Sequence, residues 1–325
     1  MPMRFSRGRV AALIALAATA CAHVPPVAEA PAVPVGPPPP PGPVCRVIQV
    51  ADCGDDGDCT GVEMMGASCF RAVLPGESLI EMAREFDLGF SELASANPGL
   101  DPFVPTVGAT VIIPTEWILP RAGGPARIVV NLSEMRLYWF PKNGGPVMTF
   151  PVGVGTEGWL TPVGEFKVTQ KQENPPWVVP ASIRREEPDL PAVVPPGPDN
   201  PLGTHALRLN KASILIHGTD KPFGVGRKAS HGCLRLYPED IPVLYEQVPV
   251  GTRVVIVREP VKVGVRNGRV FVEAHADEDS TLNLLTEARR ILKKRKLEDR
   301  VDGALLEAAL KDPRGYPIDV TVERS

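Results

Sequence analysis

The chain has 325 residues, including 38 prolines and 30 glycines, so it is long for one compact core and favours loops and strands over long helices. Lysine and arginine total 35 and aspartate and glutamate total 38, which gives a formal net charge of −3. There is no basic cluster with interleaved aromatic residues, which argues against nucleic acid as a partner. We therefore expect two or three folded units and a mainly β architecture.

Residues 1–20 read as an export signal. Three arginines precede an apolar run over residues 10–20, and Cys21 follows the small residues at its end. The run is too short to cross a bilayer as a mature helix. The pattern predicts an exported, periplasmic protein. At the cleavage site two alternatives stay open: ordinary signal-peptidase cleavage, or lipidation of Cys21 as in a bacterial lipobox, although Ala18 stands where that motif usually has leucine. In the second case the lipid is the only membrane contact that we expect.

Residues 21–44 are rich in proline, which favours extended polyproline conformation and predicts a semi-rigid tether. Residues 45–69 form a cysteine-rich segment. The chain's six cysteines are Cys21, Cys45, Cys53, Cys59, Cys69 and Cys233. In an oxidising compartment the four between 45 and 69 are candidates for two disulfides, with three alternative pairings. The acidic run 52–58 lacks the glutamate that closes an EF-hand loop, so we predict no metal site there.

Residues 70–115 predict a short strand, a helix that begins after Ser78, a second helix through Leu93 and a closing strand, "ATVIIP". The segments "PGESL", "ANP" and "VGATVIIP" in this order resemble a LysM module. The resemblance implies a βααβ unit that binds the N-acetylglucosamine-containing glycan of peptidoglycan. The alternative is a small helical hairpin without affinity for glycan.

Residues 124–259 alternate short strands with turns. Runs such as "RIVVNL", "MRLYWF" and "TRVVIVRE" are typical of a β-sandwich or barrel-like domain. Between them, residues 173–203 are too proline-rich for a regular element and predict a lid or binding loop. Residues 260–325 form a C-terminal extension with a β-pair around Asn267-Gly268 and a pair of surface helices within residues 281–311.

Cys233 is the candidate nucleophile, because an ionised thiol is the strongest side-chain nucleophile near neutral pH and needs a nearby base. His217 ends a predicted strand before Gly218, and His231 lies two residues before the cysteine. Gly232 has no Cβ, so backbone amides there can approach a developing oxyanion. Nearby positive charges come from Arg227, Lys228 and Arg235. From spacing alone, a buried structural cysteine remains the alternative.

The order of these residues resembles the catalytic motif of L,D-transpeptidases of the YkuD type, in which a His-Gly pair precedes an S-H-G-C-x-R loop. The matching residues are His217, Gly218, Ser230, His231, Gly232, Cys233 and Arg235. The segments "TPVGEF" and "NPLGTHALRL" match the same domain further upstream. The resemblance implies that Cys233, activated by His217, attacks the carbonyl at the L-centre of diaminopimelate in a tetrapeptide stem. D-alanine is then released, and the thioester passes to an amine.

The resemblance also implies roles around the nucleophile. Backbone amides near Gly232 would hold the oxyanion, and the Gly218 carbonyl would orient the imidazole. Ser230, His231 and Arg235 are expected to contact substrate. The alternatives are that Ser230 and Arg235 only hold the turn together, and that His231 is the base in place of His217. Three aromatic residues either line the donor cleft or belong to the core: Tyr138, Trp159 and Trp177.

The predicted partners are peptidoglycan, as glycan ligand and as stem-peptide donor, and an amine acceptor that stays open. A second diaminopimelate gives a 3-3 crosslink, a lysine of an envelope lipoprotein gives protein–wall attachment, and water gives carboxypeptidase activity. No cofactor or metal is expected. Two other functions compete: a Cys/His peptidoglycan hydrolase, which usually has its cysteine before its histidine in the chain, and a non-catalytic LysM lipoprotein that tethers the wall.

Overall fold

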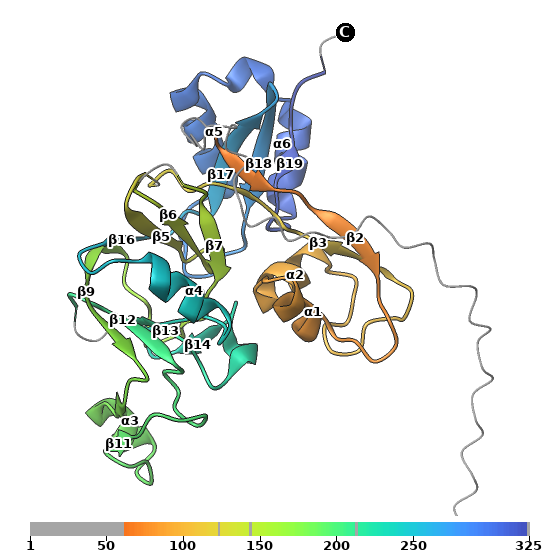
Figure 1. Ribbon diagram of the computed structural model, residues 1–325. Helices are drawn as coiled ribbons and strands as arrows, with labels where there is room; N and C mark the ends of the chain where they lie inside the picture. Colours follow the sequence, from red (N-terminus) through yellow and green to blue (C-terminus); the bar gives the residue numbers. More distant parts are fainter. Residues whose placement is uncertain (1–61, 123, 143–144, 212–213, 324–325) are drawn as a thin grey trace, which may run out of the picture. The chain divides into compact units, whose positions relative to one another are not determined.

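A computed structural model describes residues 62–122, 124–142, 145–211 and 214–323 (Figure 1). The predictions for residues 1–20, for Cys21, for the tether, and for Cys45, Cys53 and Cys59 lie outside the described residues. Cys69 is disulfide-bonded, whereas Cys233 is not. Within the described ranges, no helix combines the length and apolar character needed to cross a membrane.

Residues 69–113 fold in the order strand, helix, helix, strand (Figure 1). The elements are β2 (Cys69–Ala72), α1 (Leu79–Glu85), α2 (Phe90–Ala96) and β3 (Thr110–Ile113). The two strands pair antiparallel, and the inner faces of all four elements share one hydrophobic cluster. Ser78 begins α1 as predicted, because its Oγ accepts the N–H of Glu81 at 3.3 Å.

The region after residue 124 is built on one mixed eight-stranded sheet in the order β15-β13-β12-β9-β16-β5-β6-β7. In chain order its strands are β5 (Arg127–Asn131), β6 (Arg136–Phe140), β7 (Met148–Pro151), β9 (Gly164–Glu173), β12 (His205–Leu209), β13 (Leu215–His217), β15 (Leu234–Arg235) and β16 (Arg253–Val257). The first part of β9 pairs with β16 and the rest pairs with β12, so this long strand belongs to both halves of the curled sheet. The mainly β prediction is confirmed.

Smaller elements complete this region. They are β8 (Val154–Gly155), which pairs parallel with β14 (Lys228–Ser230), the 3₁₀ turn η1 (Pro222–Gly224) and α4 (Asp240–Gln247). Ile241 and Leu244 of α4 pack into the hydrophobic core of the sheet. Because α4 follows β15 after a short turn, this packing fixes the segment that carries Cys233.

The proline-rich segment 173–203 contains regular structure, contrary to the prediction. It holds β10 (Trp177–Val178), α3 (Ala181–Glu186) and β11 (Val193–Val194), of which α3 and β11 are labelled in Figure 1. The strand β10 pairs antiparallel with β11. Proline is tolerated here because Pro180 occupies the N-cap of α3, where no helical N–H is lost. We call residues 175–200 the insertion.

The C-terminal extension is a small folded unit, and its helices are less exposed than predicted. Its elements are β17 (Val261–Arg266), β18 (Arg269–Ala274), α5 (Leu284–Arg295), η2 (Glu298–Arg300), α6 (Gly303–Lys311) and β19 (Ile318–Asp319). The predicted β-pair is confirmed as β17 and β18. Each helix buries one apolar face against this sheet, so the helices form a core with it instead of lying on the surface alone. The pair β1 (Met64–Gly66) and β4 (Glu116–Ile118) precedes the main sheet.

Candidate active site

Strand alternation gathers the chemically active side chains on one face at the edge of the sheet. Arg208 on β12 pairs in register with Leu215 on β13, and His217 on β13 pairs with Arg235 on β15. Because side chains alternate along a strand, these four residues share a face. The intervening residues Leu207, Ile216 and Leu234 are fully buried in the core on the other face.

The imidazole of His217 is buried, oriented and neutral. Its ring is 3% exposed, and its Nδ1–H donates to the Gly218 carbonyl at 2.6 Å. This bond puts the proton on Nδ1 and leaves the Nε2 lone pair available. Burial, together with the charge of Arg235, lowers the pKa of His217 to about 4. The imidazole is therefore uncharged at neutral pH.

Cys233 lines the same cleft as His217 and is a neutral thiol in the resting site. Burial raises the pKa of the Cys233 thiol, and a hydrogen bond with the Leu215 backbone and the charges of Arg235 and Arg208 oppose this rise only in part. With both groups neutral, the thiol proton has to be transferred as the sulfur attacks, instead of before it.

Hydrogen bonds fix the loop before the nucleophile. Ser230 donates through Oγ to the Cys233 carbonyl at 2.6 Å, and the same Oγ accepts the Gly232 N–H at 3.1 Å. Thr161 donates to the Gly232 carbonyl at 3.1 Å. Gly232 has φ +97°, a conformation that L side chains rarely adopt. Ser230 therefore holds the turn, and the Gly232 amide predicted for the oxyanion is already paired in this geometry.

His231 lies at the rim of the cleft and contacts the insertion. Its Nε2 is 3.2 Å from Glu186 Oε2 on α3, and its ring packs edge-on against Trp159 with centroids 5.1 Å apart. Its side chain is 35% exposed. The buried His217, with its oriented ring, fits the base better than His231 does.

The predicted cations separate into two groups. Arg227 stacks over Phe90 at 4.9 Å, and Lys228 pairs with Asp279 at 3.0 Å, so both are engaged outside the cleft. Arg235 lines the cleft, and so does Arg208, which the sequence reasoning did not single out. Strand alternation is the signal that could have found Arg208, because it stands two residues after Ala206, the register partner of His217.

The cleft has a volume of about 400 Å³ and is walled by the sheet edge, the Cys233 loop and the insertion. This volume is within the usual range for ligand sites. Trp159 and Trp177 line the cleft, as one alternative predicted. Tyr138 does not, because it is fully buried and donates its hydroxyl to Glu134 at 2.8 Å.

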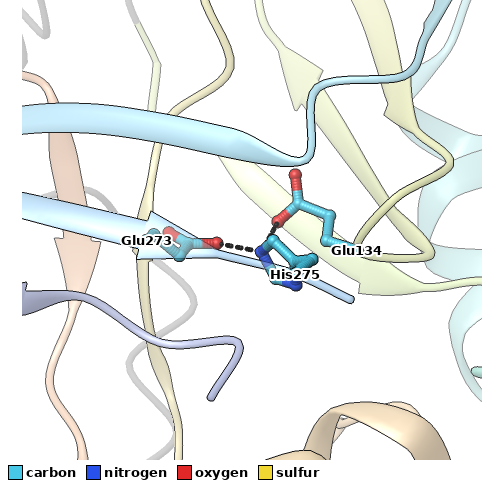
Figure 2. A group of neighbouring side chains, drawn as sticks. All are labelled: Glu134, Glu273 and His275. Atoms are coloured by element: carbon cyan, nitrogen blue, oxygen red, sulfur yellow. Dashed lines mark hydrogen bonds and ion pairs between the residues drawn. The ribbon is translucent and has the colours of Figure 1, made fainter. Parts of the chain in front are cut away.

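One group of metal-ligand side chains occurs within the described ranges: Glu134, Glu273 and His275 (Figure 2). His275 Nε2 lies 2.7 Å from Glu273 and 3.9 Å from Glu134. Lys262 donates its ammonium to both carboxylates at 2.7 Å. Because the Lys262 ammonium already contacts both carboxylates and offsets part of their charge, this cluster fits a structural ion network better than a metal site.

Comparisons with known proteins extend these observations. Residues 125–256 match the family model of the L,D-transpeptidase catalytic domain, YkuD. The chain is 37% identical over 276 residues to Probable L,D-transpeptidase YcfS of Escherichia coli (strain K12), covering 80% of this chain and 86% of that protein. It is 40% identical over 251 residues to Probable L,D-transpeptidase YbiS of the same strain, covering 73% and 81%. L,D-transpeptidase 3 from Mycobacterium tuberculosis, a solved structure, aligns with TM-score 0.31 and 20% identity over 40% of this chain and 59% of that chain.

Proposed function

This chain belongs to the L,D-transpeptidase family, and from that premise we propose that Cys233 and His217 carry a two-step acyl transfer on peptidoglycan stem peptides. The family assignment confirms the prediction made from the histidine-glycine pair and the S-H-G-C-x-R loop, and it makes the protein an enzyme. The observation that supports the residue roles is the oriented, neutral His217 in the same cleft as the reduced Cys233.

In the first step, the Cys233 sulfur attacks the carbonyl at the L-centre of diaminopimelate in the donor tetrapeptide. His217 Nε2 takes the thiol proton as the carbon–sulfur bond forms, and the Gly218 carbonyl steadies the resulting imidazolium through Nδ1–H. The carbon–nitrogen bond to D-alanine then breaks, and the imidazolium returns the proton to the leaving amine. A thioester on Cys233 remains.

In the second step, an acceptor amine attacks the thioester. His217 removes a proton from the amine, the carbon–sulfur bond breaks, and the thiol is restored. A diaminopimelate amine would give a 3-3 crosslink, a lysine of an envelope lipoprotein would attach that protein to the wall, and water would give carboxypeptidase activity. We propose an amine acceptor, because apolar and aromatic side chains line much of the cleft and limit access of water.

The proposal is tested by intact mass after incubation with disaccharide-tetrapeptide and, separately, with a carbapenem. With each reagent we expect an adduct on the wild-type protein that is absent from Cys233→Ala. With the tetrapeptide, the adduct has the mass of the donor minus D-alanine. A folded sample that forms no adduct with either reagent would leave the chain as a non-catalytic wall tether. Adding amine acceptors one at a time then identifies the product, and free tripeptide alone would favour a hydrolase.

We also propose that residues 70–115 are a LysM module that binds glycan. The βααβ order and the antiparallel pairing of β2 with β3 support this. Exposed apolar side chains gather on the loops beside the two helices: Leu74, Phe103, Val104 and Val107. Co-sedimentation with purified peptidoglycan should be weakened by Val104→Ser and unchanged by Val250→Ser, an equally apolar exposed residue after α4. Equal binding by both variants would contradict a glycan site on these loops.

We further propose export to the periplasm, with a lipid on Cys21 as the anchor to the envelope membrane. This rests on the arginines, the short apolar run and the cysteine within residues 1–21. The mass of the mature N-terminal peptide decides between the alternatives. A lipid-sized increase that is lost in Cys21→Ser supports the anchor, and an unmodified cleaved N-terminus refutes it.

A further inference from the structure

Two arginines flank the nucleophile on the cleft side of the sheet. Arg208 stands on β12 and Arg235 on β15, on either side of β13, which carries His217. Register and strand alternation place both side chains on the face of His217, and both line the cleft together with Cys233. A substrate that reaches Cys233 therefore enters a cleft that holds two guanidinium groups.

The cleft lining itself supplies no carboxylate. None of the described residues that line it is acidic. Glu186 faces His231 at the rim, and Asp220 interacts electrostatically with Arg235 without lining the cleft. Arg235 Nε is buried without a hydrogen-bond partner. A buried guanidinium donor without a partner is costly, so this one points to a group supplied by a ligand.

We propose that Arg208 and Arg235 together bind a free carboxylate of the donor stem, so the enzyme selects an anionic donor over one whose carboxylate is amidated. This inference rests on the proposed transpeptidase function and adds its substrate class. The guanidinium fork matches the two oxygens of a carboxylate and gives short, charge-assisted hydrogen bonds. Binding the carboxylate there would hold the adjacent scissile carbonyl at Cys233.

The donor has three carboxylates with this chemistry, and the test separates them. One is on diaminopimelate, one on the glutamate of the stem and one on the terminal D-alanine. Four disaccharide-tetrapeptides are compared: the fully free donor and three donors that are each amidated at one of these positions. For each donor, kcat/KM for acylation of Cys233 is measured by intact mass at low and high salt.

For the wild-type protein we expect one amidated donor to lose about 10- to 100-fold in kcat/KM, the range of a charge-assisted hydrogen bond. Arg208→Gln should lose a similar factor with the free donor and discriminate less between it and that amidated donor. Arg208→Lys should recover part of the loss, because it restores the charge without the fork. The matched control is Arg185→Gln, an exposed arginine of α3 that does not line the cleft.

The result that would overturn the proposed function differs from the results that would overturn this inference alone. No acylation of the wild-type protein by any donor would overturn the proposed function. Acylation at equal rates with free and amidated donors would overturn this inference alone. An equal loss with every donor in Arg208→Gln, at an unchanged melting temperature, would also overturn it, because discrimination would then not depend on Arg208. The same loss of kcat/KM in Arg185→Gln would mean that the effect comes from the net charge of the protein and not from Arg208.

Discussion

The two residues of the proposed catalytic pair are both uncharged at rest, which distinguishes this site from thiolate–imidazolium sites. His217 is buried beside the positive charge of Arg235, and Cys233 is buried in the same cleft. Both environments oppose charge on the two partners. The proton is therefore expected to move during attack on the substrate, and the arginines limit how far the thiol pKa rises.

Alkylation of Cys233 by iodoacetamide should report this state. Only the thiolate reacts, so the raised pKa of Cys233 predicts a rate that keeps rising with pH and reaches no plateau near neutrality. Enzymatic acylation needs neutral His217, so it should hold at mildly acidic pH and fall as pH drops through about 4. Rates are read from intact mass across pH, with His217→Asn as the control. A plateau at neutral pH that disappears in His217→Asn would show an ion pair instead.

At the scale of elements, one buried amide holds the insertion over the cleft. Asn200 is 1% exposed, and its Nδ2 donates to the carbonyls of Pro175 and Pro195 at 2.9 and 3.1 Å. Its Oδ1 accepts the N–H of Leu202 at 2.9 Å. Asn200 thereby joins the two ends of the insertion to each other and to Leu202, shortly before β12, the strand that carries Arg208.

Asn200→Ala should loosen the insertion while leaving the sheet folded. Each buried polar group that loses its hydrogen-bond partner costs about 1–3 kcal/mol of folding free energy. The short elements of the insertion contribute too little stability to offset this cost. We expect faster proteolytic cleavage within residues 175–200 and a higher KM for the donor, measured by limited proteolysis with mass mapping and by acylation kinetics. Asp199→Ala, at the exposed neighbouring position, is the matched control. Unchanged cleavage in Asn200→Ala would mean that other contacts hold the insertion.

The strands around the site could be predicted because their apolar residues alternate, and the catalytic motif because its order is local. The high proline content predicts an irregular segment for the insertion and hides α3, a helix whose N-cap is Pro180. Sequence analysis does not identify Arg208, because its place on the face of His217 depends on the pairing of β12 with β13, and neither segment predicts that pairing by itself. Tyr138 could not be assigned to core or cleft until its partner Glu134 was known.

At the scale of the whole described molecule, buried polar contacts join the βααβ unit, the main sheet and the C-terminal extension. Glu92 of α2 pairs with Arg136 of β6 at 2.8 Å. Lys262 of β17 contacts both the Ile118 carbonyl of β4 and Glu134 at 2.6 and 2.7 Å. The sequence predicts the separate units, but these pairs join residues more than 40 positions apart and leave no local pattern.

A pair of acidic residues lies where the βααβ unit meets the catalytic segment. Asp87, between α1 and α2, shares a hydrogen bond with Asp240 at the start of α4. Burial and the neighbouring Asp87 raise the pKa of Asp240 to about 9, so one proton is retained between the two carboxyl groups. Around them, Arg136 donates to the Asp87 carbonyl, Tyr237 donates to the Leu88 carbonyl, and Arg84 pairs with Glu239.

This shared proton predicts how stability depends on pH. The folded state binds a proton that the unfolded Asp240 releases above its ordinary pKa of 3.8, so its contribution to stability is full at low pH and is lost as pH rises toward about 9. Asp240→Asn keeps an amide donor for Asp87 without the titration. Across pH 5 to 9 the wild-type free energy of unfolding should fall relative to Asp240→Asn, by at most about 1.4 kcal/mol per pH unit.

Urea unfolding of both proteins at several pH values measures this difference, with Asp189→Asn at an exposed position of the insertion as the control. Equal pH slopes for the wild type and Asp240→Asn would mean that the two carboxyl groups share no proton. Proteolysis near residues 84–90 that becomes faster above neutral pH would indicate loss of the Arg84–Glu239 pair. Together with a difference in the pH slopes, this would locate the effect at the contact between Asp87 and Asp240. The contact leads through Tyr237 and β15 to Cys233, so acylation rates measured on the same samples test whether loosening it reaches the nucleophile.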